Sequence, residues 1–209
     1  KSGSDNLMIN VLLGSSNDHK IAEIICMSQG SNIAFICPAE LNIALDVKEG
    51  VSSFAENASV KAMAYSRKYS GLVLADDSGF EVCELGGRPG VLSNRFEGLK
   101  TDYGRCQKVL SLLAHSDSTN RKAKFRCAMA VAMREELLFN CEAVCEGTVN
   151  FEPSGVNGFG YDPIFVPDGF SKSFAELSFA DKNQISHRVK ALNLVIDWIN
   201  IHGIEAIGG

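Results

Sequence analysis

The stretch Leu7-Met-Ile-Asn-Val-Leu-Leu-Gly-Ser-Ser-Asn-Asp-His-Lys20 decides the fold. Its first half is a short apolar run that ends at Leu13 and is followed by Gly14, which is typical of a buried strand and a turn. A helical face follows at once, marked by Ile21, Ile24, Ile25 and Ser28. A strand, a loop and a helix in this order predict the first unit of an α/β sheet.

Strands and helices continue to alternate after this unit. Short apolar runs predict strands at 33–37, where Pro38 stops the run, and at 72–75. Apolar residues at helical spacing predict helices within 54–69 and 103–113. The chain therefore has the element pattern of a layered α/β domain.

Two longer strands predict that the sheet is mixed. They cover 124–133 and 137–151 and are joined by a tight turn at 134–136, so without a helix between them they should pair antiparallel. A Gly- and Pro-rich loop over 152–170 follows, and Ser178 starts the last predicted helix. The apolar stripe of that helix is Ile185, Val189, Leu192, Ile196 and Ile199. The predicted class is α/β, with a mixed central sheet flanked by helices.

Composition limits the function classes. The chain has 209 residues, with 20 Lys+Arg against 25 Asp+Glu and a net charge of −5, which suits one sizeable domain. The acidic balance argues against a general binder of nucleic acid or anionic membranes, since these carry a basic excess. No apolar run approaches the roughly 18 residues of a membrane span, and the start lacks the apolar segment of a signal peptide. We expect a cytoplasmic protein.

The cysteines indicate a reducing compartment. There are seven, an odd number, and none are spaced Cys-x-x-Cys. The closest pair, Cys141 and Cys145, would share one face of a strand with apolar neighbours. Small buried thiols are therefore favoured over zinc ligands or a disulfide scaffold.

Gly14 to Lys20 forms a candidate anion site between a strand and a helix. Backbone N–H groups at a helix start attract anions, and Lys20 adds a full positive charge. The Walker pattern fails, because no glycine precedes Lys20 and Ile21 stands where a Ser or Thr would hold magnesium. The alternative is a plain N-cap by Ser16 or Asn17 with a solvated lysine.

Asp76-Asp77-Ser78-Gly79 directly follows the run 72–75. Adjacent side chains on extended backbone point to opposite sides, so one carboxylate can face a cleft. That carboxylate could hold magnesium or polarise a water. An ordinary Asx turn that closes the strand is the alternative.

Two further polar segments lie near the end of the chain. Glycines in 155–163 would let the backbone approach a ligand, and Phe159 and Tyr161 could stack on a flat ring. Lys182 and Ser186 are i,i+4 neighbours at the start of the last predicted helix, close to His187-Arg188. The alternatives are a flexible turn and a solvated polar face.

Together these segments suit a nucleotide. The cations would hold phosphates, the acids a metal and a water, and the aromatic loop or the last helix a base. Because the Walker pattern fails, a metal would have to be bound by carboxylates in other parts of the chain. The candidate ligands are Asp76, Asp77, Glu49 and Glu56. Hydrolysis follows, since a water polarised by a metal and a carboxylate is a nucleophile near neutral pH.

These residues resemble the Ham1-like inosine triphosphate pyrophosphatases. The matching motifs stand in family order over about residues 7–198, nearly the whole chain. They are Ser16-Asn17 to Glu23, Phe54-Ala-Glu-Asn57-Ala58 with Lys61, Asp76-Asp-Ser-Gly79, Gly86-Gly-Arg-Pro-Gly90 through Arg95, Gly158-Phe-Gly-Tyr-Asp-Pro163, Phe174-Ala-Glu-Leu177, and Lys182-Asn183 through Arg188. The combination is highly specific, although no single motif is.

The resemblance implies an elongated, two-lobed single domain with the active site in the cleft between the lobes, assembled as a homodimer. It implies Mg²⁺-dependent hydrolysis of ITP, dITP and XTP to the monophosphate and pyrophosphate, which keeps deaminated purines out of DNA and RNA. We expect this domain to cover 7–203. Residues 1–6 are then a disordered or artificial N-terminal segment, and 204–209 a C-terminal tail.

The resemblance also implies the site residues. Asp77 would activate the water and help to bind the metal, with Glu49 as a further metal ligand. The phosphate end would be served by Ser15, Ser16, Asn17, Asp18, His19, Lys20, Lys61 and Ser78. The sugar and base would be framed by Phe159, Gly160, Tyr161, Asp162, Lys182, His187 and Arg188.

Three departures from the family pattern stand out. Ser15-Ser16 replaces the Thr-Gly that often precedes the asparagine, Phe80 stands where Leu is usual, and Asn94-Arg95-Phe96 replaces Ala-Arg-Tyr. None removes a charged catalytic group. Two other functions keep the same residues: a purine-nucleotide sensor without hydrolysis, and an enzyme for a different nucleotide such as a modified pyrimidine.

Overall fold

A computed structural model of the chain describes residues 8–116 and 118–208, with side chains as far as residue 202. Its centre is a six-stranded mixed sheet in the order β2-β1-β3-β4-β5-β6. β1 (Ile9–Leu13) pairs parallel with β2 (Ile33–Ile36) and with β3 (Leu72–Val82). The predicted mixed α/β sheet is confirmed. Residues 1–6 lie outside the described residues.

The antiparallel half of the sheet is built from long strands. β3 pairs with β4 (Lys122–Met133), β4 with β5 (Glu136–Val149), and β5 with the short β6 (Phe165–Pro167). The tight turn between β4 and β5 has left-handed backbone at Arg134 and Glu135. The predicted hairpin is therefore present.

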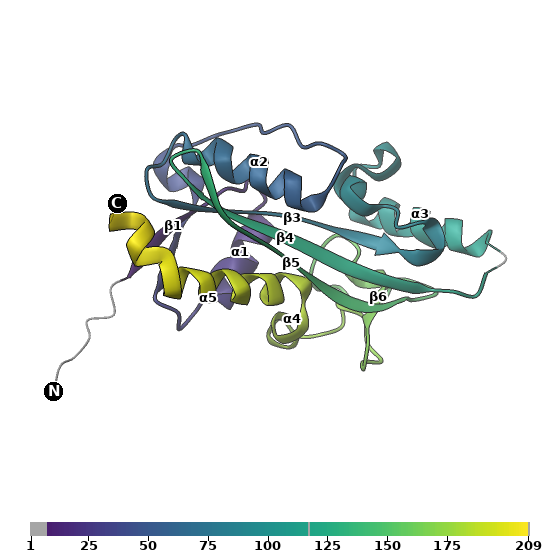
Figure 1. Ribbon diagram of the computed structural model, residues 1–209. Coiled ribbons are helices and arrows are strands. Elements are labelled where there is room, and N and C mark those ends of the chain that lie inside the picture. Colours follow the sequence, from purple (N-terminus) through teal and green to yellow (C-terminus); the bar gives the residue numbers. More distant parts are fainter. Residues whose placement is uncertain (1–7, 117, 209) are drawn as a thin grey trace.

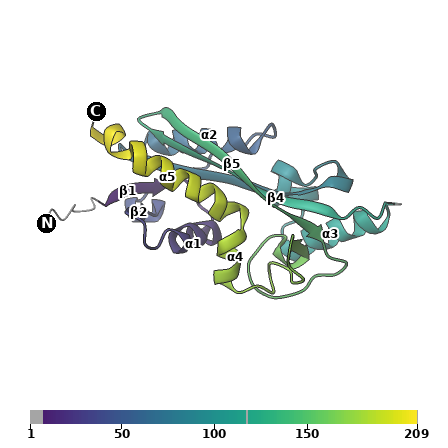
Figure 2. The ribbon, with the colours of Figure 1, turned by 60° about the horizontal axis from the view of Figure 1, so that its bottom comes forward.

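Helices cover both faces of the sheet (Figures 1 and 2). The α-helices are α1 (Asp18–Met27), α2 (Phe54–Ser66), α3 (Asp102–Ala114), α4 (Phe179–Ile185) and α5 (His187–Gly208). Short 3-10 turns occupy Pro38–Leu41, Cys83–Leu85, Gly90–Gly98 and Asp162–Ile164. α2 packs on one side of β3 and β4, and α5 packs on the other side of β4 and β5.

Two apolar cores divide the elongated molecule into lobes. The α1 lobe contains α1, β1, β2 and α5 and is filled by aliphatic side chains such as Leu13, Ile24 and Leu192. The α3 lobe contains α3, β6 and the far ends of β3 to β5. Its core is aromatic, with the Phe125 ring 5.0 Å from the Phe165 ring and 5.8 Å from the Phe174 ring. The long strands β3, β4 and β5 run through both lobes.

Two sequence expectations need correction. The strand predicted at 72–75 continues to Val82, because its polar residues still pair with β4. The single helix predicted after Ser178 is two helices, since Ser186 has extended backbone (ψ 155°) between α4 and α5. The second of them, α5, runs to Gly208, and the domain bounds 7–203 stay a prediction.

The prediction of small buried thiols is correct for part of the cysteines: Cys106, Cys127 and Cys145 are buried, Cys26, Cys37 and Cys141 are half-buried, and Cys83 is exposed. All seven cysteines lie in the described part of the chain and are free thiols. Within residues 8–116 and 118–208, no helix combines the length and the hydropathy that crossing a membrane requires.

Candidate active site

Asp76 and Asp77 lie in the middle of β3, where the two lobes meet. Both are buried, with 1% and 5% of their surface exposed. Their side chains have different partners, because neighbouring residues on a strand point to opposite faces of the sheet. The alternative of an Asx turn is wrong, since these residues pair with Met129 and Ala128 of β4.

Asp76 faces two buried cations. Its Oδ2 lies 3.0 Å from Lys20 Nζ and 3.5 Å from Arg188 Nη2. Burial alone would raise the pKa of Asp76, but the charges of Lys20 and Arg188 outweigh it and lower the pKa to about 2. Lys20 is 5% exposed, so the solvated lysine of the plain N-cap alternative is also wrong. Asp76 is therefore charged and forms ion pairs with these two cations.

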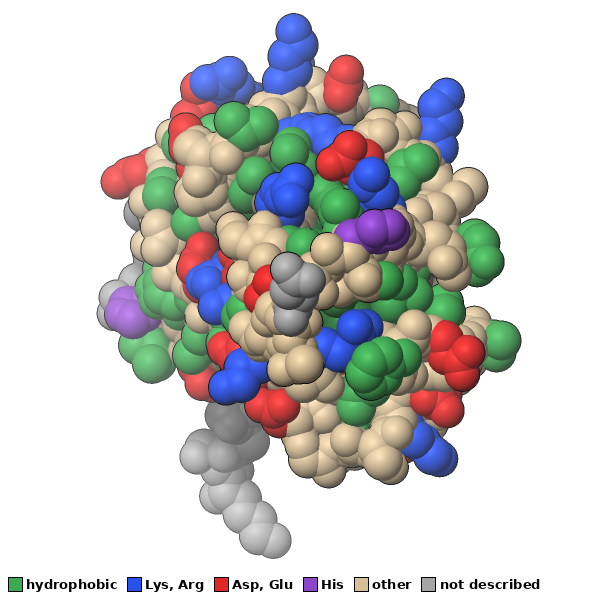
Figure 3. Space-filling model, turned by 90° about the vertical axis from the view of Figure 1, so that its right-hand side faces the viewer, with side chains coloured by type: hydrophobic (Ala, Val, Ile, Leu, Met, Phe, Trp, Pro, Cys, Tyr) green, Lys and Arg blue, Asp and Glu red, His purple; other side chains and the backbone are tan. Residues whose placement is uncertain are grey.

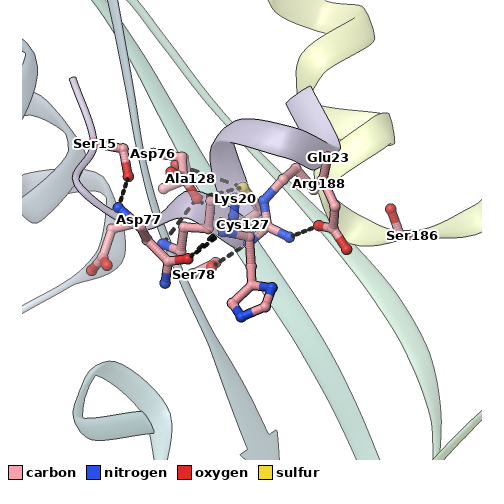
Figure 4. Close-up of polar contacts among 12 residues, drawn as sticks. Ser15, Lys20, Glu23, Asp76, Asp77, Ser78, Cys127, Ala128, Ser186 and Arg188 are labelled. Carbon is pink, nitrogen blue, oxygen red and sulfur yellow. Dashed lines mark hydrogen bonds and ion pairs between the residues drawn. The ribbon is translucent and has the colours of Figure 1, made fainter. Parts of the chain in front are cut away.

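Arg188 joins β3 to α1 and α5 (Figure 4). Its Nη2 donates to Ser78 Oγ at 2.8 Å, and its Nη1 forms an ion pair with Glu23 of α1. Burial would lower the pKa of Arg188, but Glu23 and Asp76 raise it above its ordinary value. The guanidinium is thus a fixed positive charge in the centre of the molecule.

Lys182 extends this buried network to the aromatic loop, residues 155–162. Its Nζ lies 2.8 Å from Glu23 Oε1 and 2.6 Å from Asp162 Oδ2. The network contains three cations and three carboxylates, each with 5% or less of its surface exposed: Lys20, Glu23, Asp76, Asp162, Lys182 and Arg188. The solvated polar face considered for 182–188 is wrong. Buried charges in proteins are paired, as they are here.

Asp77 belongs to a second cluster, on the α2 side of β3. Asn57 Nδ2 donates to its Oδ2 at 2.9 Å, and Lys61 Nζ lies 3.5 Å from its Oδ1. The same ammonium lies 2.7 Å from Glu49 Oε1. Burial raises the pKa of Asp77, against the lowering effect of Lys61 and Lys20. A buried carboxylate with a raised pKa is a stronger base than an exposed one.

Glu49 and Asp77 both pair with Lys61. Their carboxylate oxygens are the kind of ligand that Mg²⁺ prefers. Among the described residues, no group of three or more His, Cys, Asp or Glu gathers at one point. Magnesium at nucleotide sites commonly takes one or two carboxylates and completes its shell with phosphate and water oxygens. The residues here fit that pattern. Glu56 is exposed and bonds to Ser52, which separates it from this cluster.

An open cleft of 690 Å³ lies beside the second cluster. Its walls are the loop before α1, the segment 45–49, Lys61 of α2, and Asn94 and Arg95. Asn17 caps α1, with its Oδ1 accepting from the N–H groups of His19 and Lys20. The predicted residues on the cleft wall are Ser15, Ser16, Asn17, Lys20, Glu49 and Lys61. Asp18 lines a neighbouring groove instead.

A smaller hollow adjoins the cleft, because Lys20 and Asn94 line both. It has a volume of 40 Å³ and is lined by all seven residues predicted for the sugar and base: Phe159, Gly160, Tyr161, Asp162, Lys182, His187 and Arg188. Ser78, which is predicted for the phosphate end, lines it too. His187 is 3% exposed, and its Nδ1 has no hydrogen-bond partner in the part of the chain that the structure describes. An unpartnered buried polar atom in this hollow offers a ligand a hydrogen bond.

The two rings of the aromatic loop have different surroundings. Phe159 stacks on His19 of α1, with ring centroids 5.2 Å apart and planes at 16°. Tyr161 is 3% exposed and stacks on Phe80 at 5.0 Å, so this ring is largely part of the α3 core. Gly158 lets the backbone of the loop pass close to the Asp162 side chain, because a Cβ at this position would lie 2.0 Å from Asp162 Oδ2. Phe159 is therefore the better placed of the two for stacking on a ligand.

The charged groups on the surface are distributed differently from those in the centre. Viewed from the α3 end, acidic and basic side chains are intermixed over the face with hydrophobic ones between them (Figure 3). The cations of the site are instead inside the molecule. Lys20, Lys61 and Arg188 each lie within 3.5 Å of an aspartate of β3. Lys182 pairs with Glu23 and Asp162.

Sequence analysis missed several residues that hold the site together. Glu23 and Asn57 stood inside quoted motifs, but nothing in the pattern showed that each contacts a group far along the chain. Glu23 bonds to Lys182 across 159 residues, and Asn57 bonds to Asp77 across 20. Arg95 donates to Gly50 O at 3.1 Å and so anchors the segment that carries Glu49. Their side-chain partners are set by packing.

Comparison with known proteins gives consistent matches. A sequence model of the Ham1 family matches residues 11–198. A dITP/XTP pyrophosphatase from Coxiella burnetii is 41% identical over 189 residues, covering 88% of this chain and 94% of that protein. A dITP/XTP pyrophosphatase from Prochlorococcus marinus is 38% identical over 188 residues, covering 90% and 92%. The solved structure of a HAM1 protein from Coxiella burnetii superposes with a TM-score of 0.83 at 38% identity, covering 92% of this chain and 99% of that one.

Proposed function

Because this chain belongs to the Ham1 family, we propose that it hydrolyses deaminated purine nucleoside triphosphates such as dITP, ITP and XTP to the monophosphate and pyrophosphate. The observation that carries the proposal is the pairing of Asp77, Lys61 and Glu49 beside an open cleft that begins at the start of α1. The names of the relatives, dITP/XTP pyrophosphatases, support this substrate class. Such an enzyme cleanses the nucleotide pool.

The phosphates occupy the open cleft in this proposal. Lys20 and Lys61 stand on its wall, and so does Asn17 at the start of α1, where the positive end of the helix dipole lies. Ser15 and Ser16 add hydroxyl donors there. A triphosphate in this position would lie next to Asp77, which is 3.5 Å from Lys61.

Asp77 acts as the general base. A water attacks the anhydride between the α- and β-phosphates, a new P–O bond forms while the bridging bond breaks, and the proton of the water passes to the Asp77 carboxylate. Asn57 holds that carboxylate in place through its Oδ2. Asp77 and Glu49 would hold Mg²⁺, which when bound neutralises phosphate charge and polarises the attacking water.

The base lies against the smaller hollow, whose 40 Å³ is too small for a whole purine, so this proposal requires the walls of the hollow to move apart when the nucleotide binds. Phe159 stacks on the ring, and the buried donors Arg188 and Lys182 lie close by, with Arg188 Cζ 5.8 Å and Lys182 Nζ 5.1 Å from the Phe159 ring centre. A deaminated purine has a 6-keto oxygen where adenine has an amino group. Fixed donors can donate to this keto oxygen but leave the amino group of adenine without an acceptor, so they reject adenine. Guanine shares the keto oxygen and must be rejected at its 2-amino group.

A panel of nucleoside triphosphates with product identification tests the function. We expect pyrophosphate release from dITP, ITP and XTP, a strong preference over dGTP and dATP, and dependence on added magnesium. Cleavage of dGTP at the same rate as dITP would remove the specificity, and preference for a modified pyrimidine would change the substrate class. Binding without pyrophosphate release would instead indicate a nucleotide sensor. A cytoplasmic location and a homodimeric assembly are also part of the proposal. The mass of the protein in solution checks the homodimer.

A further inference from the structure

The Gly160 peptide of the aromatic loop is held on both sides by the first turns of α3. Its N–H donates to Asp102 Oδ2 at 2.6 Å, and its C=O accepts from Cys106 Sγ at 3.3 Å. Burial and the nearby Asp102 carboxylate raise the pKa of the Cys106 thiol to about 12, so the thiol keeps its proton as a donor. Neither residue belongs to the catalytic or binding groups described above.

The same helix end also holds the opposite wall of the small hollow. Arg105 is 8% exposed, and its Nη1 donates to Asn94 O at 3.1 Å and to Leu99 O at 3.0 Å. Its Nη2 forms an ion pair with Asp102 Oδ1. Asn94 and Gly160 both line the small hollow. Asp102 therefore connects the two walls. Its Oδ2 accepts from Gly160 in one wall, and its Oδ1 pairs with Arg105, which bonds to Asn94 in the other.

A third contact keeps these walls together. Tyr161, the residue after Gly160, donates its hydroxyl to Ser93 O at 2.8 Å, next to Asn94 in the chain. The aromatic loop thus meets the turn Gly90–Gly98 directly at Ser93 and indirectly through Asp102 and Arg105.

We propose that Asp102 is a positioning residue for base recognition, which sets the distance between the aromatic loop and the turn Gly90–Gly98. This inference rests on the proposed function, in which the base occupies the hollow between these walls. Asp102 acts through Gly160 and Arg105 and contacts no substrate atom. Because an error of about 1 Å in a positioned group can cost about a hundredfold in rate, a shared anchor of this kind controls how well the hollow fits one base.

Asp102→Ala is the main variant, and Thr101→Ala is its matched control. Thr101 caps the same helix, with its Oγ1 accepting from the Gly104 N–H at 3.1 Å, but has no contact with the aromatic loop among the described residues. Both variants weaken the start of α3, so both should lower the melting temperature. Only the first removes the acceptor of the Gly160 N–H.

We expect Asp102→Ala to raise KM for dITP about tenfold and to narrow the dITP-to-dGTP ratio of kcat/KM at least about threefold, with kcat changed less than KM. Asp102→Asn keeps an acceptor for the Gly160 N–H and should recover part of both effects. Thr101→Ala should leave KM and the ratio within about twofold. If Asp102→Ala does not fold, Asp102→Glu replaces it as the test. The longer glutamate keeps the negative charge that faces Arg105 but displaces Gly160, so it should also raise KM for dITP.

Two results would overturn the inference: an unchanged KM and ratio in Asp102→Ala, or equal changes in Asp102→Ala and Thr101→Ala. Failure of the proposed function has a different signature, since the unaltered enzyme would then release no pyrophosphate from dITP. In that case calorimetric titration of both variants with ITP still measures whether removing Asp102 weakens binding more than removing Thr101 does.

Discussion

At the scale of single residues, the two adjacent aspartates of β3 have separate tasks. Asp76 is paired with Lys20 and Arg188, and its low pKa keeps it charged as a structural partner of these cations. Asp77 has an amide and one shared ammonium as partners, and burial raises its pKa. The same residue type therefore serves as a fixed counter-charge at one position and, in the proposed function, as a base at the next.

Asp77→Asn should lower kcat for dITP by at least about a hundredfold, because a positioned general base contributes about 10²–10⁴. Folding should remain intact, since the amide is nearly isosteric and removes a buried charge whose burial is unfavourable. Steady-state pyrophosphate release and thermal melting check the two halves of this prediction. A fully active Asp77→Asn enzyme would show that Asp77 is not the base.

His187 should make the protein sensitive to acid. It is buried against Phe125, with ring centroids 4.8 Å apart, and burial together with Arg188 lowers its pKa well below 6.5. The unfolded chain then takes up a proton below pH 6.5 that the folded chain does not, so the free energy of unfolding falls as the pH falls. The stabilising effect of the neutral, buried His187 is fully present above pH 6.5, and about 1 kcal/mol of it is lost by pH 5.5.

Urea denaturation at pH 7.5 and pH 5.5 measures this effect. His187→Gln should lose less stability between the two pH values than the unaltered protein does, whatever its stability at pH 7.5. His115→Gln is the control, because His115 is exposed at the end of α3. Equal pH dependence in all three proteins would contradict the prediction.

At the scale of elements, the break between α4 and α5 places the cations. Ser178 starts α4 by accepting from the Asp181 N–H at 3.1 Å, and the helix ends at Ile185. Extended backbone at Ser186 then lets α5 begin with His187 and Arg188, which reach the centre of the sheet. A continuous helix would hold Lys182 and Arg188 at a fixed helical rotation, whereas two helices bring both to Glu23.

The segment before α2 should control the need for magnesium. Glu49 lies on the cleft wall and shares Lys61 with Asp77, whereas Glu56 in the first turn of α2 is exposed. Glu49→Gln should raise the Mg²⁺ concentration for half-maximal rate by about tenfold or more, the size of effect seen when even an indirect metal partner is removed. Magnesium titration of the dITP reaction measures it.

Glu56→Gln is the matched control for Glu49→Gln. It makes the same chemical change seven positions along the chain and should leave the magnesium requirement unchanged. The reverse outcome, a raised requirement in Glu56→Gln alone, would assign the metal to Glu56 and contradict the role given to Glu49.

At the scale of the whole molecule, the net charge of −5 is compatible with a polyanionic substrate. The cations of the site are inside the fold, and Lys20, Lys182 and Arg188 are each 5% exposed or less. Burial lowers the effective dielectric around them, so each charge acts more strongly on a bound phosphate or keto group than it would on the surface.

A bound nucleotide should stabilise both lobes together, because its proposed site takes residues from each. With Asp77→Asn to prevent turnover, ITP at a hundred times its dissociation constant should stabilise the fold by about 2.7 kcal/mol and raise the melting temperature by about 5–10 °C. Calorimetric melting with ITP and, as control, ATP measures it. An equal shift with ATP, or a melting curve in which one lobe shifts alone, would contradict the prediction.

The sequence by itself determined the opening strand–loop–helix unit, the long hairpin of β4 and β5, and the set of charged residues near the site, because apolar spacing and turn residues report on nearby chain. Only the tertiary structure decided which charges meet: Glu23 joins Arg188 across 165 residues and Lys182 across 159. It also decided that Asp76 and Asp77 divide their tasks, that β3 runs on to Val82, and that Asp102 holds the aromatic loop. The physical reason is that burial and ion pairing depend on which distant surfaces pack together, and no local periodicity records that.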